Sequence, residues 1–374
     1  MTHAYTPGLR ISEKTTVANR RSLPLLGEVI VKKGAVLKAE DIVAKTYLPG
    51  KVLAVNAVNR LGIQPKDLRE YMLKKEGDPV QKDEIIAETK PWVKMLKSVL
   101  LSPITGTIET ISAVTGQILM REPPKPIQVF AYVDGTVTEV MEKEGVVMET
   151  TATFVQGIFG VGGETVGELA MAVDTPDDIL TAECIQPAHK DKIIAGGSFI
   201  RHDAIDKAKS VGVRGIIVGG FDDEVLKKLL GYDLGVAITG TEEIGITIII
   251  TEGFGEIPMA QRTFELLKSR SGAKTSINGA TQIRAGVVRP EIIIPFTSNT
   301  SGEGTDKQTD RGMEIGDAVR VIRVPYFGRI GRIKTLPFSP QTIETEATVR
   351  ILEIEFPDGS TAIVPRTNVE MIET

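Results

Sequence analysis

The sequence predicts a multi-domain protein that combines a β region with a central α/β domain and a terminal β module. Residues 23–175 consist of short β-branched runs separated by Gly, Pro and Asp, with almost no helical period. From Lys192 to Phe296, apolar strands alternate with helical segments, which favours a mostly parallel sheet. Residues 297–312 contain no apolar side chain and read as a linker. The predicted segments are an N-terminal arm (1–22), a β region (23–185), an α/β domain (186–296), the linker (297–312) and a β module (313–374).

Composition excludes several classes of protein. The 374 residues include 44 basic and 49 acidic side chains, so a surface that binds nucleic acid over its whole extent is not expected. A single cysteine, Cys184, cannot form an internal disulfide, and three histidines are too few for a histidine-rich metal site. The chain has no run of about 18 apolar residues and no apolar core of a signal peptide at its N-terminus. We expect a soluble, cytoplasmic protein without metal, cofactor or membrane insertion.

The β region repeats one layout, in which a turn and a glycine precede a β-branched strand. Such segments begin at Gly27, Lys74, Ser102 and Ala131, which suggests stacked hairpins. The helical period is confined to Gln64–Lys75, which predicts one short amphipathic helix.

Two of these segments, KEGDPVQKDEIIAE and SPITGTIETI, resemble the barrel-sandwich hybrid fold of biotinyl and lipoyl carriers. The same fold serves without a covalent cofactor in one component of the Rnf complex, in membrane-fusion adaptors and within large RNA polymerase subunits. Carriers of this family place one lysine at the tip of a tight hairpin. Here the interval TKPWVKMLKSVLL is longer, and only Lys94, between Val93 and Met95, approaches the biotinyl Met-Lys-Met pattern. A carrier lysine and a longer hairpin with solvated lysines both remain open.

The α/β domain predicts a ligand pocket where its strands end. In open parallel sheets, ligands bind beyond the carboxyl ends of the strands, near glycine-rich loops. An ordinary set of turns and helix caps explains the same residues. No nucleophile motif accompanies them, which favours a non-enzymatic protein. His189 and His202 flank the first strand of this domain, so a role for them as acid and base stays open. The candidate pocket residues are Gly220, Asp222, Glu252 and Gly253.

Residues 315–333, IGDAVRVIRVPYFGRIGRI, resemble the KOW motif of SH3-like barrels in ribosomal and transcription-elongation proteins. That resemblance implies contact with RNA, DNA or nucleoprotein through basic and aromatic side chains. The module from Arg311 to Thr374 has 8 basic and 9 acidic residues, however, and KOW-like barrels also bind proteins. The candidate residues for nucleic-acid or partner binding are Arg320, Arg323, Tyr326, Phe327, Arg329, Arg332 and Lys334.

Taken together, these features favour a non-enzymatic adaptor or scaffold that binds protein partners through its β modules. In this interpretation the linker lets the terminal module search the space around the body of the protein. One alternative is a nucleic-acid-associated factor acting on transcription or translation through the C-terminal module. Another is a ligand-binding or carrier protein. Exposed sheet edges also predict self-association into a homo-oligomer.

Overall fold

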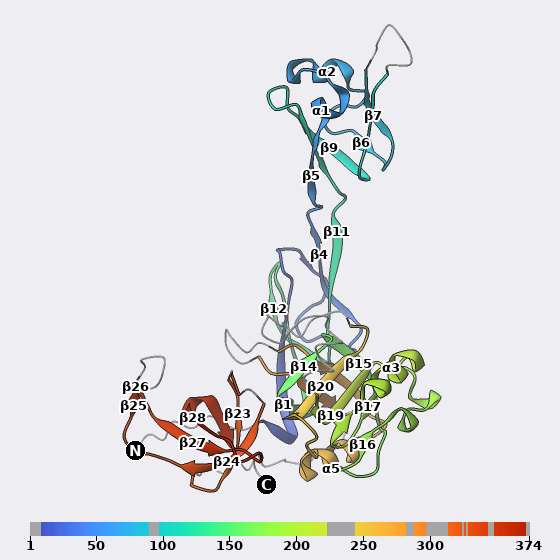
Figure 1. Ribbon diagram of the computed structural model, residues 1–374. Coiled ribbons are helices and arrows are strands. Elements are labelled where there is room, and N and C mark those ends of the chain that lie inside the picture. The colour runs from blue at the N-terminus through green and yellow to red at the C-terminus, as the bar shows by residue number, and fades with distance from the viewer. Residues whose placement is uncertain are drawn as a thin grey trace.

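The computed structural model describes residues 9–89, 97–222, 244–281, 288–296, 313–323, 325–326, 328–342 and 348–371. Of these described residues, 48% lie in strands and 13% in helices, so the described part of the chain is mainly β and contains several sheets. Figure 1 shows three parts: a base, a head that projects from it on a narrow stalk, and a C-terminal sheet beside the base. No helix among the described residues is long and apolar enough to cross a membrane.

A thirteen-stranded mixed sheet forms the base. Its central strands are parallel: β15 pairs with β17, β17 with β19, and β19 with β20. The strands run in the order β14 (Phe159–Val161), β20 (Thr247–Phe254), β19 (Gly215–Phe221), β17 (Lys192–Ala195), β15 (Glu164–Met171), β21 (Lys274–Asn278), β22 (Glu291–Pro295), β13 (Gly145–Gln156), β12 (Gly135–Met141) and β3 (Val36–Leu37). Off this path, β1 (Ile11–Ser22) pairs with β13, and β18 (Phe199–Ile200) pairs with β19 and with β16 (Ile179–Leu180).

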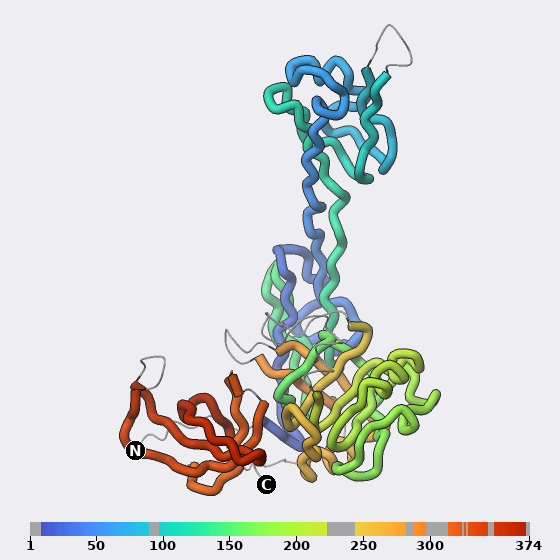
Figure 2. The backbone as a smooth tube through the Cα atoms, in the orientation of Figure 1, coloured from blue at the N-terminus to red at the C-terminus, as the bar shows by residue number. Residues whose placement is uncertain are grey.

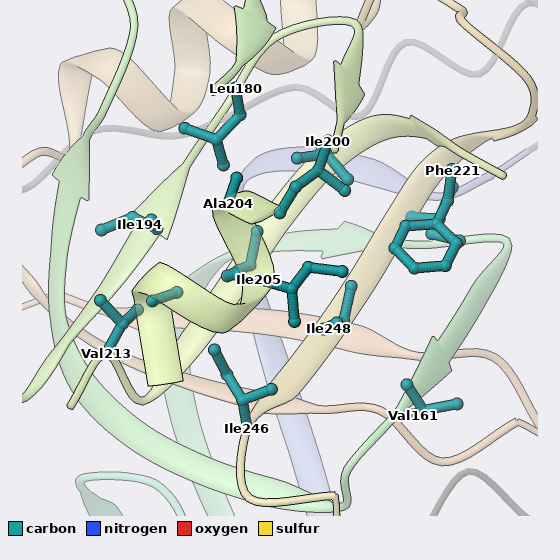
Figure 3. Close-up of a cluster of buried hydrophobic side chains, with 14 of the residues drawn as sticks. Val161, Leu180, Ile194, Ile200, Ala204, Ile205, Val213, Phe221, Ile246 and Ile248 are labelled. Carbon is teal, nitrogen blue, oxygen red and sulfur yellow. The ribbon is translucent and has the colours of Figure 1, made fainter. Parts of the chain in front are cut away.

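Helices cover both faces of the parallel strands, which explains why these strands are apolar throughout. Alternate residues of one strand point to opposite faces. Ile194 and Ile248 therefore pack against α3 (His202–Val211) in the cluster of Figure 3, and Ile193 packs with the residues of α5 (Gln261–Ser269) on the other face. Residues 223–243, between β19 and β20, lie outside the described residues.

The head is an insertion between the two strands of the stalk. One sheet of the head has the order β5 (Val52–Asn56), β10 (Gln117–Arg121), β9 (Gly106–Ile111) and β6 (Pro79–Val80), and β7 (Ile85–Glu88) pairs with β8 (Val99–Leu101). Where one short amphipathic helix is predicted over Gln64–Lys75, the structure has a 3-10 turn, Pro65–Asp67, followed by α2 (Leu68–Tyr71). A further short helix, α1 (Ala57–Leu61), precedes them. Leu68 is fully buried among the head's strands, which accounts for the apolar pattern of that stretch.

The stalk consists of β4 (Ile42–Leu48) and β11 (Lys125–Phe130), paired antiparallel, with β2 (Glu28–Val29) beside β4 at its foot. Seven residues of β4 at about 3.3 Å each give the stalk a length of roughly 23 Å. Figure 2 shows the chain rising through this pair to the head and returning beside itself. The four repeated segments thus form two nested pairs. The segments that begin at Gly27 and Ala131 form the outer pair, in the base, and those that begin at Lys74 and Ser102 form the inner pair, in the head.

The C-terminal sheet is antiparallel with the order β28 (Thr361–Pro365), β27 (Ile351–Glu355), β24 (Ile330–Thr335), β23 (Ala318–Val321) and β29 (Val369–Met371). A 3-10 turn, Arg366–Asn368, precedes the last strand, and β25 (Gln341–Thr342) pairs with β26 (Thr348–Val349). Within the described part of the chain, no strand pairing closes this sheet into a barrel.

Two predicted boundaries differ from the structure. The N-terminal arm contains a twelve-residue strand, β1, which pairs with β13 along most of its length. The boundary predicted between 185 and 186 falls within the base sheet, because β13, β14 and β15 pair with β22, β20 and β21 from beyond it. Both differences arise because strands far apart in the sequence complete one sheet.

Candidate functional site

The predicted pocket residues do meet at the carboxyl ends of the parallel strands, but the chain itself fills the space. Gly220 and Gly253 are neighbours across β19 and β20. A Cβ atom on Gly220 would lie 2.0 Å from the Gly255 carbonyl oxygen, and one on Gly253 would lie 2.4 Å from that of Gly328. Asp222 follows directly after the end of β19. These glycines therefore permit close backbone packing, and the contact with Gly328 brings in the C-terminal sheet.

Glu252 and Arg320, predicted to belong to separate sites, form one buried ion pair. Arg320 Nη2 donates to Glu252 Oε2 at 2.9 Å, and Arg320 Nη1 donates to Glu370 Oε1, also at 2.9 Å. Glu252 Oε1 accepts a hydrogen bond from the Ala260 backbone, and Arg289 pairs with the second oxygen of Glu370. Two carboxylates and two guanidinium groups thus balance in charge. We call this set of four charged side chains the seam.

Arg320 is only 2% exposed, which corrects its expected place on a binding surface. Its guanidinium joins β20 of the base to β23 and β29 of the C-terminal sheet. The position of the sheet also differs from the freely searching module that the sequence suggests, because the seam and the Gly253 contact hold it against the base. The linker, 297–312, lies outside the described residues.

The other candidate residues of the C-terminal module remain nearer the surface, and several already have partners. Arg329 pairs with Asp358 at 2.7 Å and stacks 3.8 Å from the centroid of the Phe356 ring. Tyr326 also packs on Phe356, at 5.7 Å between ring centroids.

Two further basic candidates extend from β24, where Arg332 donates to the Gly316 carbonyl and Lys334 lies 3.6 Å from Glu353. Arg323 is partly buried and also takes part in an interaction. Phe327 lies outside the described residues. The positive charge that the sequence concentrates in this module is thus largely neutralised within the module or at the seam.

The head exposes an apolar surface that sequence reasoning did not single out. On β7 and β8, Ile86 and Leu100 point into the head, whereas Ile85, Val99 and Leu101 point outward and are 40 to 43% exposed. Ile85 and Leu101 are cross-strand partners, so the outward side chains form one strip. In the sequence, residues 90–96, which include Trp92 and Lys94, fall between β7 and β8 and lie outside the described residues. We call these three outward side chains the head strip.

An open hollow of about 590 Å³ lies at the opposite ends of the parallel strands from the predicted pocket. Gly162, Thr165, Lys209, Arg214 and Thr247 line part of it. Arg214 is partnered by Asp191 and by the Val166 carbonyl, and the two threonine hydroxyls bond to each other at 2.8 Å. Because Arg214 and both threonine hydroxyls are already bonded within the protein, the hollow has the features of a surface depression.

No catalytic or metal-binding arrangement emerges from the described residues. They contain no group of three or more His, Cys, Asp or Glu side chains arranged to hold a metal ion. Burial, with Lys192 nearby, lowers the pKa of His189, and His202 Nδ1 lies 3.2 Å from Asp206 on the same helix. Neither histidine lines the hollow or the seam.

Comparison with known proteins adds no family to these geometries. No family model matched the chain in a scan, and no curated protein matched it. The seam and the head strip are therefore the two features on which a function can rest.

Proposed function

We propose that the protein is a non-enzymatic multi-domain adaptor that binds a protein partner through the head strip. The observation that carries the proposal is the outward apolar strip on a head held roughly 23 Å from the base by a two-stranded stalk. An exposed apolar strip is a typical protein-binding feature, and its position at the end of a stalk makes it accessible to a large partner.

The chemistry around the head strip indicates the kind of partner. Residues 89–98, which fall between β7 and β8 in the sequence, contain three lysines, no acidic residue and the only tryptophan of the chain. Lys97 pairs with Glu88, which leaves the sequence of the connection itself basic and apolar. A complementary partner surface has an apolar centre and an acidic rim.

The finer fold assignments belong to the same proposal. The head sheets, which carry both carrier-like segments, are inferred to be a barrel-sandwich hybrid, and the parallel strands with α3 and α5 an α/β unit. The C-terminal strand order, with a 3-10 turn before the last strand, supports an SH3-like barrel. In the adaptor, the base and C-terminal sheet form one support, because the seam joins them.

Site-specific photocrosslinking from Val99 in native cells tests the adaptor proposal. We expect a crosslinked protein that persists after nuclease treatment and disappears when Ile85→Lys and Leu101→Lys are combined. Val36→Lys is the control for adding a lysine at an exposed apolar position, since Val36 is a 79% exposed residue of the base. An adduct that survives the double variant would refute a role for the head strip. An adduct that nuclease removes would favour the nucleic-acid alternative instead.

A further inference from the structure

The foot of the stalk is joined to the base sheet through Arg21. Its guanidinium makes two hydrogen bonds to the Glu164 carboxylate, both of 2.6 Å, while its Nε donates to the Phe130 carbonyl at 2.9 Å. The same guanidinium carbon lies 5.0 Å from the centroid of the Tyr132 ring. Phe130 is the last residue of β11, so one side chain contacts the sheet, the end of the stalk and the turn that follows it.

Tyr132 occupies a backbone conformation that tyrosine rarely adopts. Its φ is +70°, in the left-handed region, and its side chain is almost fully buried. Its carbonyl accepts a hydrogen bond of 2.5 Å from the Ser276 hydroxyl. Its own hydroxyl lies close enough to Glu291 to lower the pKa of that carboxyl, but the contact does not reach the geometry of a regular hydrogen bond in the described part of the chain. A strained residue whose buried hydroxyl has only this weak contact depends on the packing around it.

Glu291 lies on β22 beside these groups and shares a sheet face with Glu164. The cross-strand row runs from Glu164 through Asn278 to Glu291 and then to Gln156. Among the described residues no ion pair joins Glu291 to a basic side chain, and Arg21 is committed to Glu164. Burial, followed by the negative charge of Glu164, raises the pKa of Glu291 to about 7, against smaller opposing effects of the Tyr132 hydroxyl and Arg21.

We propose that this cluster is a proton-sensitive joint, in which the charge state of Glu291 decides how firmly the foot of the stalk is seated on the base. With Glu291 protonated, the positive charge of Arg21 balances Glu164, and the cluster is neutral. When the Glu291 O–H releases its proton to solvent, a second carboxylate becomes charged in a partly buried site whose cation, Arg21, is already paired with Glu164. Opening the turn at Tyr132 lets water solvate the added negative charge, so deprotonation of Glu291 weakens the contact between the foot of the stalk and the base.

The titratable and charged groups that face Glu291 come from three separate elements. They are Glu164 of β15, Arg21 of β1 and Tyr132 after β11. Lys274, Asp134 and Glu40 form a separate ion-paired set at the same foot, at 2.6 and 2.7 Å. Burial opposes ionisation of Asp134, but hydrogen bonds from Lys274, Ala39 and Lys38 outweigh it and hold the pKa of Asp134 below its usual value, so Asp134 keeps its charge through neutral pH.

Electron spin–spin distances between head and base test the joint in the full-length chain. Labels are attached through Val114→Cys on the head and Lys207→Cys on α3, in a Cys184→Ser background that removes the native thiol. From about pH 5.5 to about pH 8.5, a range that brackets the titration, we expect a second population to grow by up to tenfold per pH unit. Its midpoint is expected near the pKa of Glu291.

Variants decide whether Glu291 is responsible. Glu291→Gln is expected to hold the low-pH distance distribution throughout, whereas Glu149→Gln, which neutralises an exposed glutamate on β13, is expected to behave as the unsubstituted protein. Tyr132→Phe is expected to raise the midpoint, because the ionised carboxylate loses a hydroxyl that stabilises it. A distance distribution that ignores pH, a pH response that survives Glu291→Gln, or a midpoint that Tyr132→Phe leaves unmoved would overturn the proposal.

Discussion

Replacing Arg320 with methionine perturbs the seam at its centre. Methionine keeps an unbranched side chain of similar length but removes both hydrogen-bonded ion pairs, each of 2.9 Å, to Glu252 and Glu370. Glu252 then retains only the Ala260 backbone N–H, while Glu370 keeps Arg289. Removing one partner of a buried ion pair costs about 3–5 kcal/mol. Because Arg289 still compensates one carboxylate, we expect the lower end of that range, about 3 kcal/mol.

Hydrogen exchange measured by mass spectrometry shows in which strands this loss of stability occurs. A loss of about 3 kcal/mol raises the open population of the seam on the order of 100-fold, since 1.36 kcal/mol is tenfold. The increase is expected in the paired strands β23 and β29 and in the end of β20, and not in the head. Adding Glu252→Gln to Arg320→Met is expected to recover at least half of the loss, because it removes the uncompensated carboxylate.

Two outcomes would refute this reasoning. Exchange at the seam that stays close to that of the unsubstituted protein would mean that the ion pairs contribute nothing to docking of the C-terminal sheet. A double variant no more protected than Arg320→Met alone would mean that the loss comes from packing and not from the stranded charge of Glu252.

Two further predictions concern the foot of the stalk and its neck, where Gly50 follows the end of β4. The pKa of Glu291 is raised to about 7 in the folded protein from 4.5, so stability is greatest below pH 4.5 as far as this group is concerned and falls as pH rises to about 7, by about 3 kcal/mol in total. Denaturant titrations across that range should show the slope, and Glu291→Gln should remove it. Gly50→Ala would place a Cβ atom 1.7 Å from the Glu122 carbonyl oxygen, so we expect selective loss of exchange protection in the head. Equal protection in both proteins would contradict the close packing at the neck.

Whether a segment forms a strand or a helix could mostly be predicted from the sequence, because burial of one or both faces sets the spacing of its apolar residues. The runs around Ile194, Ile217 and Ile249 are apolar on both faces and are parallel strands covered by helices. The strand β1 leaves a weaker record. Its sequence carries few apolar side chains among twelve residues, and only Ser12 and Val17 are buried, so it reads as a polar arm.

The seam could not be predicted, because its partners are distant in the sequence and its residues resemble surface residues. Arg320 and Glu252 are 68 positions apart, and an arginine on an alternating strand has the pattern of a solvated face. The sequence pattern placed Arg320 among residues for nucleic-acid or partner binding and Glu252 among residues of a ligand pocket. In the structure the two side chains form one buried ion pair. Each charge is explained only once the other is placed beside it.

The head joins the stalk through neighbouring positions, since Leu48 and Lys125 are paired where the two strands of the stalk meet the head. A piece of chain whose two ends touch can be removed, shortened or exchanged without redirecting the path of its host. The head and the base are thus separable parts of one chain. A different head grafted at this point would be held by the same stalk, at the same distance from the same base.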